Sequence, residues 1–132
     1  MVIDTSAVVA LFLNEPDAAA IQSALIQNPV RIMSAGTFLE TSIVIEARLG
    51  LSGVGELDLL IHKASIEIVP VDLEQVELAR AAYRRYGKGR HPAGLNFGDC
   101  FAYALCQVRA EPLLYKGDDF SRTDVLSVEL NQ

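Results

Sequence analysis

Short apolar runs alternate with longer segments of helical hydrophobic period, and this alternation constrains the fold of the chain more than any other feature. The runs predict strands at residues 1–3, 31–34, 66–71 and 112–115, and a fifth at 125–128. Helices are predicted at residues 4–13, 17–28, 36–49, 56–64, 72–86 and 96–110. Alternating strands and helices indicate an α/β fold with mostly parallel strands, whose carboxyl ends share one edge of the sheet. Open α/β sheets bind their ligands at that edge.

The length of 132 residues predicts a single domain, residues 1–132, that folds without disulfides or a structural metal. Cys100 and Cys106 lie in one apolar segment that fits neither a zinc site nor a disulfide framework, so we expect both to pack in the core. No basic leader precedes the first apolar run, and no uncharged stretch approaches the ~18 residues of a membrane span. The expectation is a soluble cytoplasmic protein with no membrane association.

Charge is distributed unevenly along the chain. The net charge of −6 argues against a protein that coats nucleic acid, because such proteins carry an excess of Lys and Arg. Residues 80–98 nevertheless contain no acid and nearly half of the 11 basic residues. The cations of this segment, termed the basic strip, are Arg80, Arg84, Arg85, Lys88 and Arg90. Either a solvated helix end and loop or a contact for a phosphate backbone explains such a strip.

Acids occur at four places where the predicted sheet edge meets a helix or turn. Asp4 follows the first strand directly, and Asp118 and Asp119 follow the fourth strand in the turn GDDF. Glu40 and Asp99 lie near the starts of their helices, with apolar residues on the same helical face in the following turns. We therefore expect Glu40 and Asp99 on buried helix faces.

Each acid also has a simpler explanation as a helix cap. Asp4 suits an N-cap, and Glu40 completes a capping-box pattern with Thr37. Asp99 stands three residues after Asn96, itself a capping residue. Their predicted convergence favours chemistry, because several carboxylates with few basic partners repel one another unless cations compensate. Mg²⁺, for which Mn²⁺ substitutes, prefers such oxygen ligands without His or Cys.

A carboxylate site that holds Mg²⁺ supports phosphoryl transfer or phosphodiester hydrolysis. Asp4 and Asp99 are the first candidates for metal ligands, since each follows an apolar segment at a helix start. Asp118 or Asp119 would complete a second metal position. Glu40 would hold a water bound to the ion or act as the base.

The remaining candidates are substrate-binding residues. Thr5 and Ser6 would hydrogen-bond to the carboxylates or to substrate, although both also suit the first turn of a helix. The cations expected to contact phosphate are Arg84, Arg85, Lys88, Arg90 and Lys116.

In the order and spacing of four stretches, the chain resembles the PIN-domain nucleases and, among them, the VapC-type toxins of bacterial toxin–antitoxin pairs. The stretches are VIDTSAVVALFLNEPDA, FLETSIVIEARLG, YGKGRHPAGLNFGDCFAYALC and PLLYKGDDFSRTDV. The resemblance implies a three-layer α/β/α sandwich with a mostly parallel five-stranded sheet. The acidic quartet of the family corresponds to Asp4, Glu40, Asp99 and either Asp118 or Asp119, and the match leaves that last choice open.

The resemblance further implies a Mg²⁺-dependent endoribonuclease that acts on RNA, works as a homodimer and is inhibited by a VapB-type antitoxin. Antitoxins of this kind cover a groove of the toxin and direct a basic side chain toward the acids. An acidic pocket would attract such a cation electrostatically.

Two other functions are alternatives. A Mg²⁺-dependent phosphatase of the haloacid-dehalogenase type also has an Asp after its first strand, but it requires a second Asp where this chain has Ser6. A catalytically silent PIN-like binding module would use the acids only as helix caps. Metal binding separates the silent module from a metal-dependent enzyme, because Mg²⁺ or Mn²⁺ raises the melting temperature only of a protein with a real site.

Overall fold

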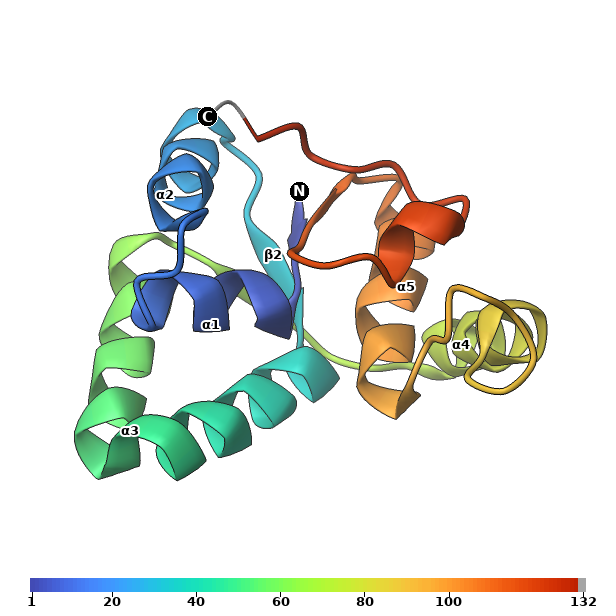
Figure 1. The fold of residues 1–132 in the computed structure, drawn as a ribbon, viewed down its shortest axis with the longest axis horizontal. Coiled ribbons are helices and arrows are strands. Elements are labelled where there is room, and N and C mark those ends of the chain that lie inside the picture. The colour runs from blue at the N-terminus through green and yellow to red at the C-terminus, as the bar shows by residue number, and fades with distance from the viewer. Residues whose placement is uncertain (131–132) are drawn as a thin grey trace.

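The computed structural model describes residues 1–130, which form a parallel sheet between two layers of helices (Figure 1). Within this range the sheet has four strands in the order β3-β2-β1-β4: β1 (Val2–Ile3), β2 (Ile32–Ser34), β3 (Glu67–Val69) and β4 (Leu113–Leu114). One layer consists of α1 (Thr5–Phe12), α2 (Ala18–Gln27) and α3 (Ala35–Lys63), and the other of α4 (Leu73–Tyr86) and α5 (Phe97–Arg109). A short 3-10 helix, η1 (Phe120–Arg122), follows β4. The predicted three-layer α/β fold is confirmed.

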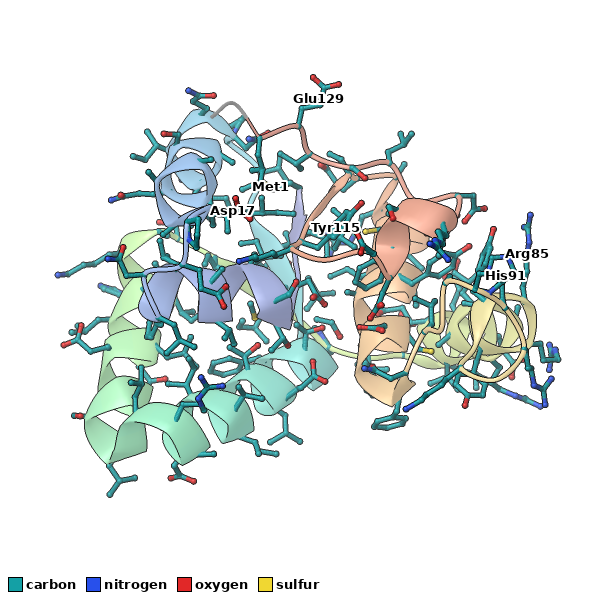
Figure 2. All side chains as sticks on the ribbon, viewed as in Figure 1. Met1, Asp17, Arg85, His91, Tyr115 and Glu129 are labelled. Carbon is teal, nitrogen blue, oxygen red and sulfur yellow. The ribbon has the colours of Figure 1, made fainter. Side chains whose placement is uncertain are left out.

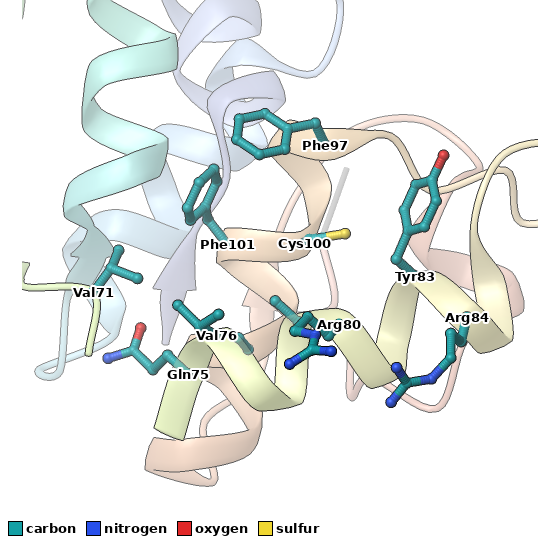
Figure 3. Close-up of a pocket in the computed structure, with 11 residues that line it drawn as sticks. Val71, Gln75, Val76, Arg80, Tyr83, Arg84, Phe97, Cys100 and Phe101 are labelled. Carbon is teal, nitrogen blue, oxygen red and sulfur yellow. The ribbon is translucent and has the colours of Figure 1, made fainter. Parts of the chain in front are cut away.

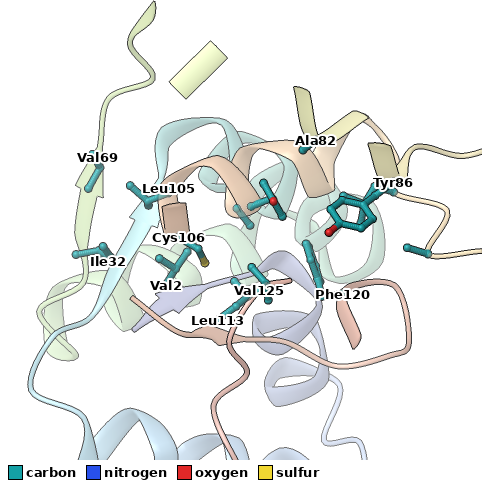
Figure 4. Close-up of a cluster of buried hydrophobic side chains, with 14 residues drawn as sticks. Val2, Ile32, Val69, Ala82, Tyr86, Leu105, Cys106, Leu113, Phe120 and Val125 are labelled. Atoms are coloured by element: carbon teal, nitrogen blue, oxygen red, sulfur yellow. The ribbon is translucent and has the colours of Figure 1, made fainter. Parts of the chain in front are cut away.

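Neighbouring residues of each strand belong to two different buried clusters. The cluster beside α4 and α5 contains Val2, Leu113 and Leu105 (Figure 4). The cluster beside the other helical layer contains the next residue of each strand, Ile3 and Leu114. This division follows from the alternation of side chains across a strand. Because both faces of the sheet are covered, the strands read as continuous apolar runs.

The fifth strand predicted at residues 125–128 is wrong. In the described part of the chain this segment forms one isolated parallel bridge, between Ser127 and Leu113. The N–H of Leu113 donates to the carbonyl of Leu126 (2.8 Å), and the N–H of Val128 donates to the carbonyl of Leu113 (2.9 Å). Successive residues of a strand direct their backbone groups to opposite neighbours. A two-residue β4 therefore offers one residue to this segment and one to β1.

The helices predicted at residues 36–49 and 56–64 are joined into α3. Gly50 interrupts this span with a φ of 71°, a left-handed conformation that glycine adopts without steric cost. Gly50 thus ends the first helical segment as expected, but the second segment starts immediately after it. At the start of α4, Asp72 accepts from the backbone N–H of Gln75 (2.9 Å), whereas the side-chain amide of Gln75 donates to the carbonyl of Pro70 (3.0 Å), so only half of a capping box forms.

The two cysteines pack in the core as predicted. Cys100 and Cys106 are buried free thiols of α5, and burial raises the pKa of Cys106 to about 12. Such a thiol stays protonated and unreactive at neutral pH. Separately, residues 1–130 contain no helix with the length and apolarity needed to cross a membrane.

The sheet order brings the predicted acids toward one edge. Strand β1 has β2 on one side and β4 on the other, and all three run parallel. The chain moves outward in one direction through β2 and β3 and then returns to add β4 on the opposite side of β1. Ligands bind at such a reversal, beyond the carboxyl ends of the central strands.

Candidate active site

Asp4 is placed where β1 and β4 end side by side. Its N–H donates to the carbonyl of Leu114 (3.0 Å). Its side chain caps α1, because Oδ2 accepts from the backbone N–H (3.0 Å) and the hydroxyl (2.7 Å) of Ser6. The second carboxylate oxygen, Oδ1, is buried and has no hydrogen-bond partner among residues 1–130. Helix capping therefore accounts for only one of the two oxygens of this carboxylate.

Lys116 fixes the direction of the Ser6 hydroxyl. The backbone N–H of Lys116 donates to Ser6 Oγ (2.9 Å). Since an N–H can only donate, the hydrogen of Ser6 is left for Asp4 Oδ2. The ammonium of Lys116 lies near acids of the α1–α2 connection, 3.0 Å from Glu15 Oε2 and 3.8 Å from Asp17 Oδ2. Ser6 therefore supports Asp4, and Lys116 is already engaged in ion pairs.

Glu40 lies in the second turn of α3, which begins directly after β2. The capping box predicted between Thr37 and Glu40 is wrong. Ser34 caps the helix instead, accepting from the N–H of Gly36 (3.2 Å). Thr37 is buried inside the first turn. The capping explanation for Glu40 is thereby removed.

The side chain of Glu40 is half-buried and contacts α1. Its Oε1 accepts from the hydroxyl of Thr5 (2.6 Å), and that hydroxyl also lies 2.9 Å from Thr41 Oγ1. The expectation that Glu40 lies on a buried helix face is wrong, since Ile43, three residues later on the same face, is 60% exposed. The buried stripe of α3 passes instead through Thr41 and Ile45. Glu40 thus stands at the margin of the core, where a charged carboxylate remains partly hydrated.

Asp99 is buried near the start of α5, as predicted. It forms a complete capping box with Asn96: its N–H donates to Asn96 Oδ1 (2.9 Å), and its Oδ2 accepts from the N–H of Asn96 (3.0 Å). Burial raises the pKa of Asp99 to about 7, against the lowering effect of the Asn96 N–H, and the charges of Asp4, Asp119 and Glu40 raise it further. These acids therefore lie within electrostatic reach of one another.

The two acids of the GDDF turn differ in their surroundings. Asp118 and Asp119 are both exposed between β4 and η1. The carbonyl of Asp118 accepts from the hydroxyl of Ser121 (2.7 Å). Asp119 directly precedes η1, and the charge of Asp119 raises the pKa of the Asp99 carboxyl.

The donor set fits a hard divalent cation. Burial raises the pKa of Asp4, and the charge of Glu40 adds to the increase despite the hydrogen bonds from Ser6. A cation beside the bare Oδ1 would relieve both the burial cost and the repulsion. Within residues 1–130, however, no three His, Cys, Asp or Glu side chains converge closely enough to form a ready-made cage. Mg²⁺ tolerates this arrangement, because it keeps several waters and uses one or two carboxylates.

The basic strip lies apart from the acids, on the carboxyl end of α4 and the following loop. Figure 2 shows Arg85 and His91 together at one end of the molecule. Arg85 stacks over the ring of Tyr86 at 4.8 Å and lies 3.9 Å from Asp124. All five cations of the strip are exposed, and Arg80 pairs with Glu77 (3.2 Å), which leaves Arg84, Arg85, Lys88 and Arg90. The structure thus separates these cations from the acidic edge.

An apolar groove of about 660 Å³ runs between α4 and α5 (Figure 3). Its walls include Val76, Tyr83, Phe97 and Phe101, and none of the five predicted acids lines it. The groove was not predicted from the sequence. The available signal was Phe97 and Phe101, which are spaced by one helical turn and lie on the same side of α5.

Comparisons with known proteins agree with this architecture. The PIN domain family model matches residues 1–126. Ribonuclease VapC of Mycolicibacterium smegmatis is 58% identical, covering 97% of this chain and 99% of that protein. Among solved structures, Mycobacterium tuberculosis VapC20, a Sarcin-Ricin loop cleaving toxin, has a TM-score of 0.79 at 18% identity, covering 96% of this chain and 97% of that chain.

A toxin–antitoxin complex from Klebsiella pneumoniae has a TM-score of 0.72 at 16% identity, covering 96% of this chain and 95% of that chain. At these identities the two solved structures establish a shared fold. The match to the family and the high identity to the mycobacterial relative cover nearly the whole chain. The chain therefore belongs to the PIN-domain family and is a VapC-type member of it.

Proposed function

We propose that this protein is a Mg²⁺-dependent endoribonuclease and the toxin of a VapBC-type toxin–antitoxin pair, with Mn²⁺ able to replace Mg²⁺. The observation that carries the proposal is Asp4 Oδ1, a buried carboxylate oxygen without a partner in residues 1–130. The charge of Glu40 raises the pKa of Asp4, and the charges of Asp4, Asp119 and Glu40 raise the pKa of Asp99. Acids that only cap helices have no need to be gathered at one edge. The relative named Ribonuclease VapC supports RNA as the substrate.

The residues present suggest a division of roles. Bound Mg²⁺ would supply neutralisation of phosphate charge and activation of water. Asp4 and Asp99 would hold the ion, and Ser6 would keep Asp4 oriented. Asp119 is our choice for the fourth acid, because its charge already reaches Asp99. Glu40 would orient the attacking water or accept its proton.

The RNA backbone would be held by the exposed part of the basic strip. Arg84, Lys88 and Arg90 are exposed and follow one another along the end of α4 and the next loop. Arg85 is partly engaged by Asp124. Lys116 is paired with acids of the α1–α2 connection, so we assign it no direct role in binding substrate.

The proposed partners are a VapB-type antitoxin and a second copy of the chain. The solved complex from Klebsiella pneumoniae is a toxin–antitoxin assembly with this fold. Two large apolar side chains next to the acids support a covering partner: Leu39 is 63% exposed and Phe97 is 79% exposed. Leu39 precedes Glu40, and Phe97 lies two residues before Asp99. A segment that covered these side chains would also block the acids.

The proposal is tested by RNA cleavage. Purified protein would be incubated with a pool of structured and single-stranded RNAs, including a sarcin–ricin loop hairpin, in Mg²⁺, Mn²⁺ or EDTA. We expect cleavage that requires the metal and is lost in Asp4→Ala and Asp99→Asn. Asp72→Asn is the matched control, because Asp72 caps α4 and its charge is not among those that raise the pKa of Asp4 or Asp99.

Three outcomes would contradict the proposal. An intact RNA pool under every condition, with no rise in melting temperature on addition of Mg²⁺ or Mn²⁺, would favour the silent binding module. Equal cleavage by the wild type and by Asp99→Asn would place the activity outside this site. Metal-dependent hydrolysis of phosphomonoesters, with RNA left intact, would favour a phosphatase.

A further inference from the structure

The first turns of α3 and α5 approach each other through two glycines. A Cβ on Gly98 would overlap the carboxylate of Glu40, and a Cβ on Gly36 would overlap the ring of Phe101. Each helix therefore places a side chain over a glycine of the other helix. Both contacts are possible only because these two positions lack side chains.

Glu40 is held on its other side by α1. The hydroxyl of Thr5 donates to Glu40 Oε1 at 2.6 Å, whereas the oxygen closest to the position of a Gly98 Cβ is Oε2. The two oxygens of one carboxylate thus meet two different helices. One oxygen of this half-buried side chain is thus hydrogen-bonded by Thr5, and the other lies in the space that Gly98 leaves open.

We propose that Gly98 is a positioning residue. Because Gly98 has no side chain, the Glu40 carboxylate, hydrogen-bonded by the Thr5 hydroxyl, is able to lie beside Asp99. Asp99 is the next residue of α5, so the space left at Gly98 sets how closely Glu40 approaches it. Glycine is a poor helix former, and Gly98 is buried within the first turn of α5. The space it leaves is occupied by the Glu40 carboxylate, not by an apolar side chain. This inference rests on the proposed nuclease function of the same site.

Gly98→Ala is the direct test. The group that blocks the new methyl is the far end of a flexible side chain, so Glu40 can swing away and the helix gains a better helix former. We expect Gly98→Ala to fold with a melting temperature close to that of the wild type. Its kcat for RNA cleavage should fall by about 100-fold, the effect of a small misplacement of a reacting group, while KM for RNA stays unchanged.

Thr5 provides a second test that does not depend on Gly98. Thr5→Val keeps the shape of the side chain but removes the donor to Glu40, so kcat should fall by about 10-fold or more. Thr5→Ser keeps the hydroxyl and should restore most of the lost kcat. A purely structural role of Thr5 would not give this pattern at an unchanged KM.

Gly53→Ala is the matched control. Gly53 is another buried helical glycine, past the kink at Gly50, and a Cβ there would meet Leu49 Cβ at 2.6 Å and Ile45 Cγ2 at 3.0 Å. These atoms are close to the backbone and cannot move away easily. Gly53→Ala should therefore lower the melting temperature and leave kcat unchanged, the opposite of Gly98→Ala.

A measurement without RNA completes the test. The rise in melting temperature caused by Mg²⁺ or Mn²⁺ should be smaller for Gly98→Ala than for the wild type and for Gly53→Ala, because a displaced Glu40 would no longer hold a water bound to the ion. If Glu40→Gln abolishes cleavage but Gly98→Ala matches the wild type in kcat and in the metal-induced shift, the positioning role is wrong and the nuclease proposal stands. A wild type that cleaves no RNA and gains no stability from either metal would overturn both proposals.

Discussion

The acidic edge and the basic strip are built in opposite ways. Asp4, Glu40 and Asp99 come from distant parts of the sequence, and Asp4 and Asp99 are buried. The cations Arg84 and Lys88 are close neighbours in sequence, and both are exposed. Burial makes the carboxyl groups of Asp4 and Asp99 sensitive to the charges of neighbouring acids, whereas exposed charges are screened by water and salt. We therefore expect the acids to determine the chemical step and the cations to determine affinity for RNA.

The largest expected effect is on the acids. Asp99→Asn keeps the size of the side chain and can still cap α5, but it removes a proposed metal ligand. We expect kcat to fall by about 100- to 1,000-fold. Thermal stability in metal-free buffer should be unchanged or increased, because the substitution removes a buried charge that neighbouring acids repel. Steady-state cleavage kinetics and thermal unfolding check this. If Asp99→Asn lost thermal stability along with activity, Asp99 would have a structural role instead.

The next largest effect is on the basic strip. Replacing Arg84 and Lys88 together by Gln should raise KM for RNA by about 10-fold while kcat stays the same, because exposed cations add binding energy without touching the reacting atoms. The slope of log affinity against log salt should decrease by about 0.7 for each phosphate contact that is lost. Binding titrations at several salt concentrations measure this slope. A fall in kcat at saturating RNA would break the proposed division between the two regions.

The pH dependence of stability provides a smaller effect. The pKa of Asp99 is about 7 in the folded protein and 3.8 without perturbation, so the folded state binds the proton more tightly. The contribution of this group to stability is complete below about pH 4 and is lost as the pH rises toward 7. In metal-free buffer, the wild type should therefore gain stability relative to Asp99→Asn between pH 8 and pH 5. If the stability of the two proteins changed equally with pH, this prediction would be contradicted. Added Mg²⁺ should weaken the pH dependence of the wild type.

The smallest expected effect is at Lys116. Its ammonium pairs with Glu15 at 3.0 Å in a partly exposed site, so Lys116→Met should cost less than about 1 kcal/mol of stability. Because the backbone N–H that supports Ser6 is retained, KM and kcat should change by less than about twofold. A large rise in KM would return Lys116 to the substrate-binding residues predicted from the sequence.

Local signals in the sequence predicted most of the helices well. The helix starting after Asp72 ends at Tyr86 before Gly87, and Asn96 caps the helix that carries Asp99, as expected. The errors occur where neighbouring segments compete. Ser34, directly at the end of β2, caps α3 in place of Thr37. The strand predicted at residues 125–128 has only one residue of β4 available for pairing.

The sequence by itself determined the α/β class, the buried strands and the identity of the acids, because hydrophobic period and helix caps are local properties. Only the tertiary structure decided which carboxylate oxygens are restrained and which is bare. The bare oxygen of Asp4 depends on Ser6 and on the backbone of Lys116, far along the chain. The contact between Glu40 and Gly98 likewise joins two helices at close range. Such contacts follow from how the elements pack, and no local pattern of residues encodes them.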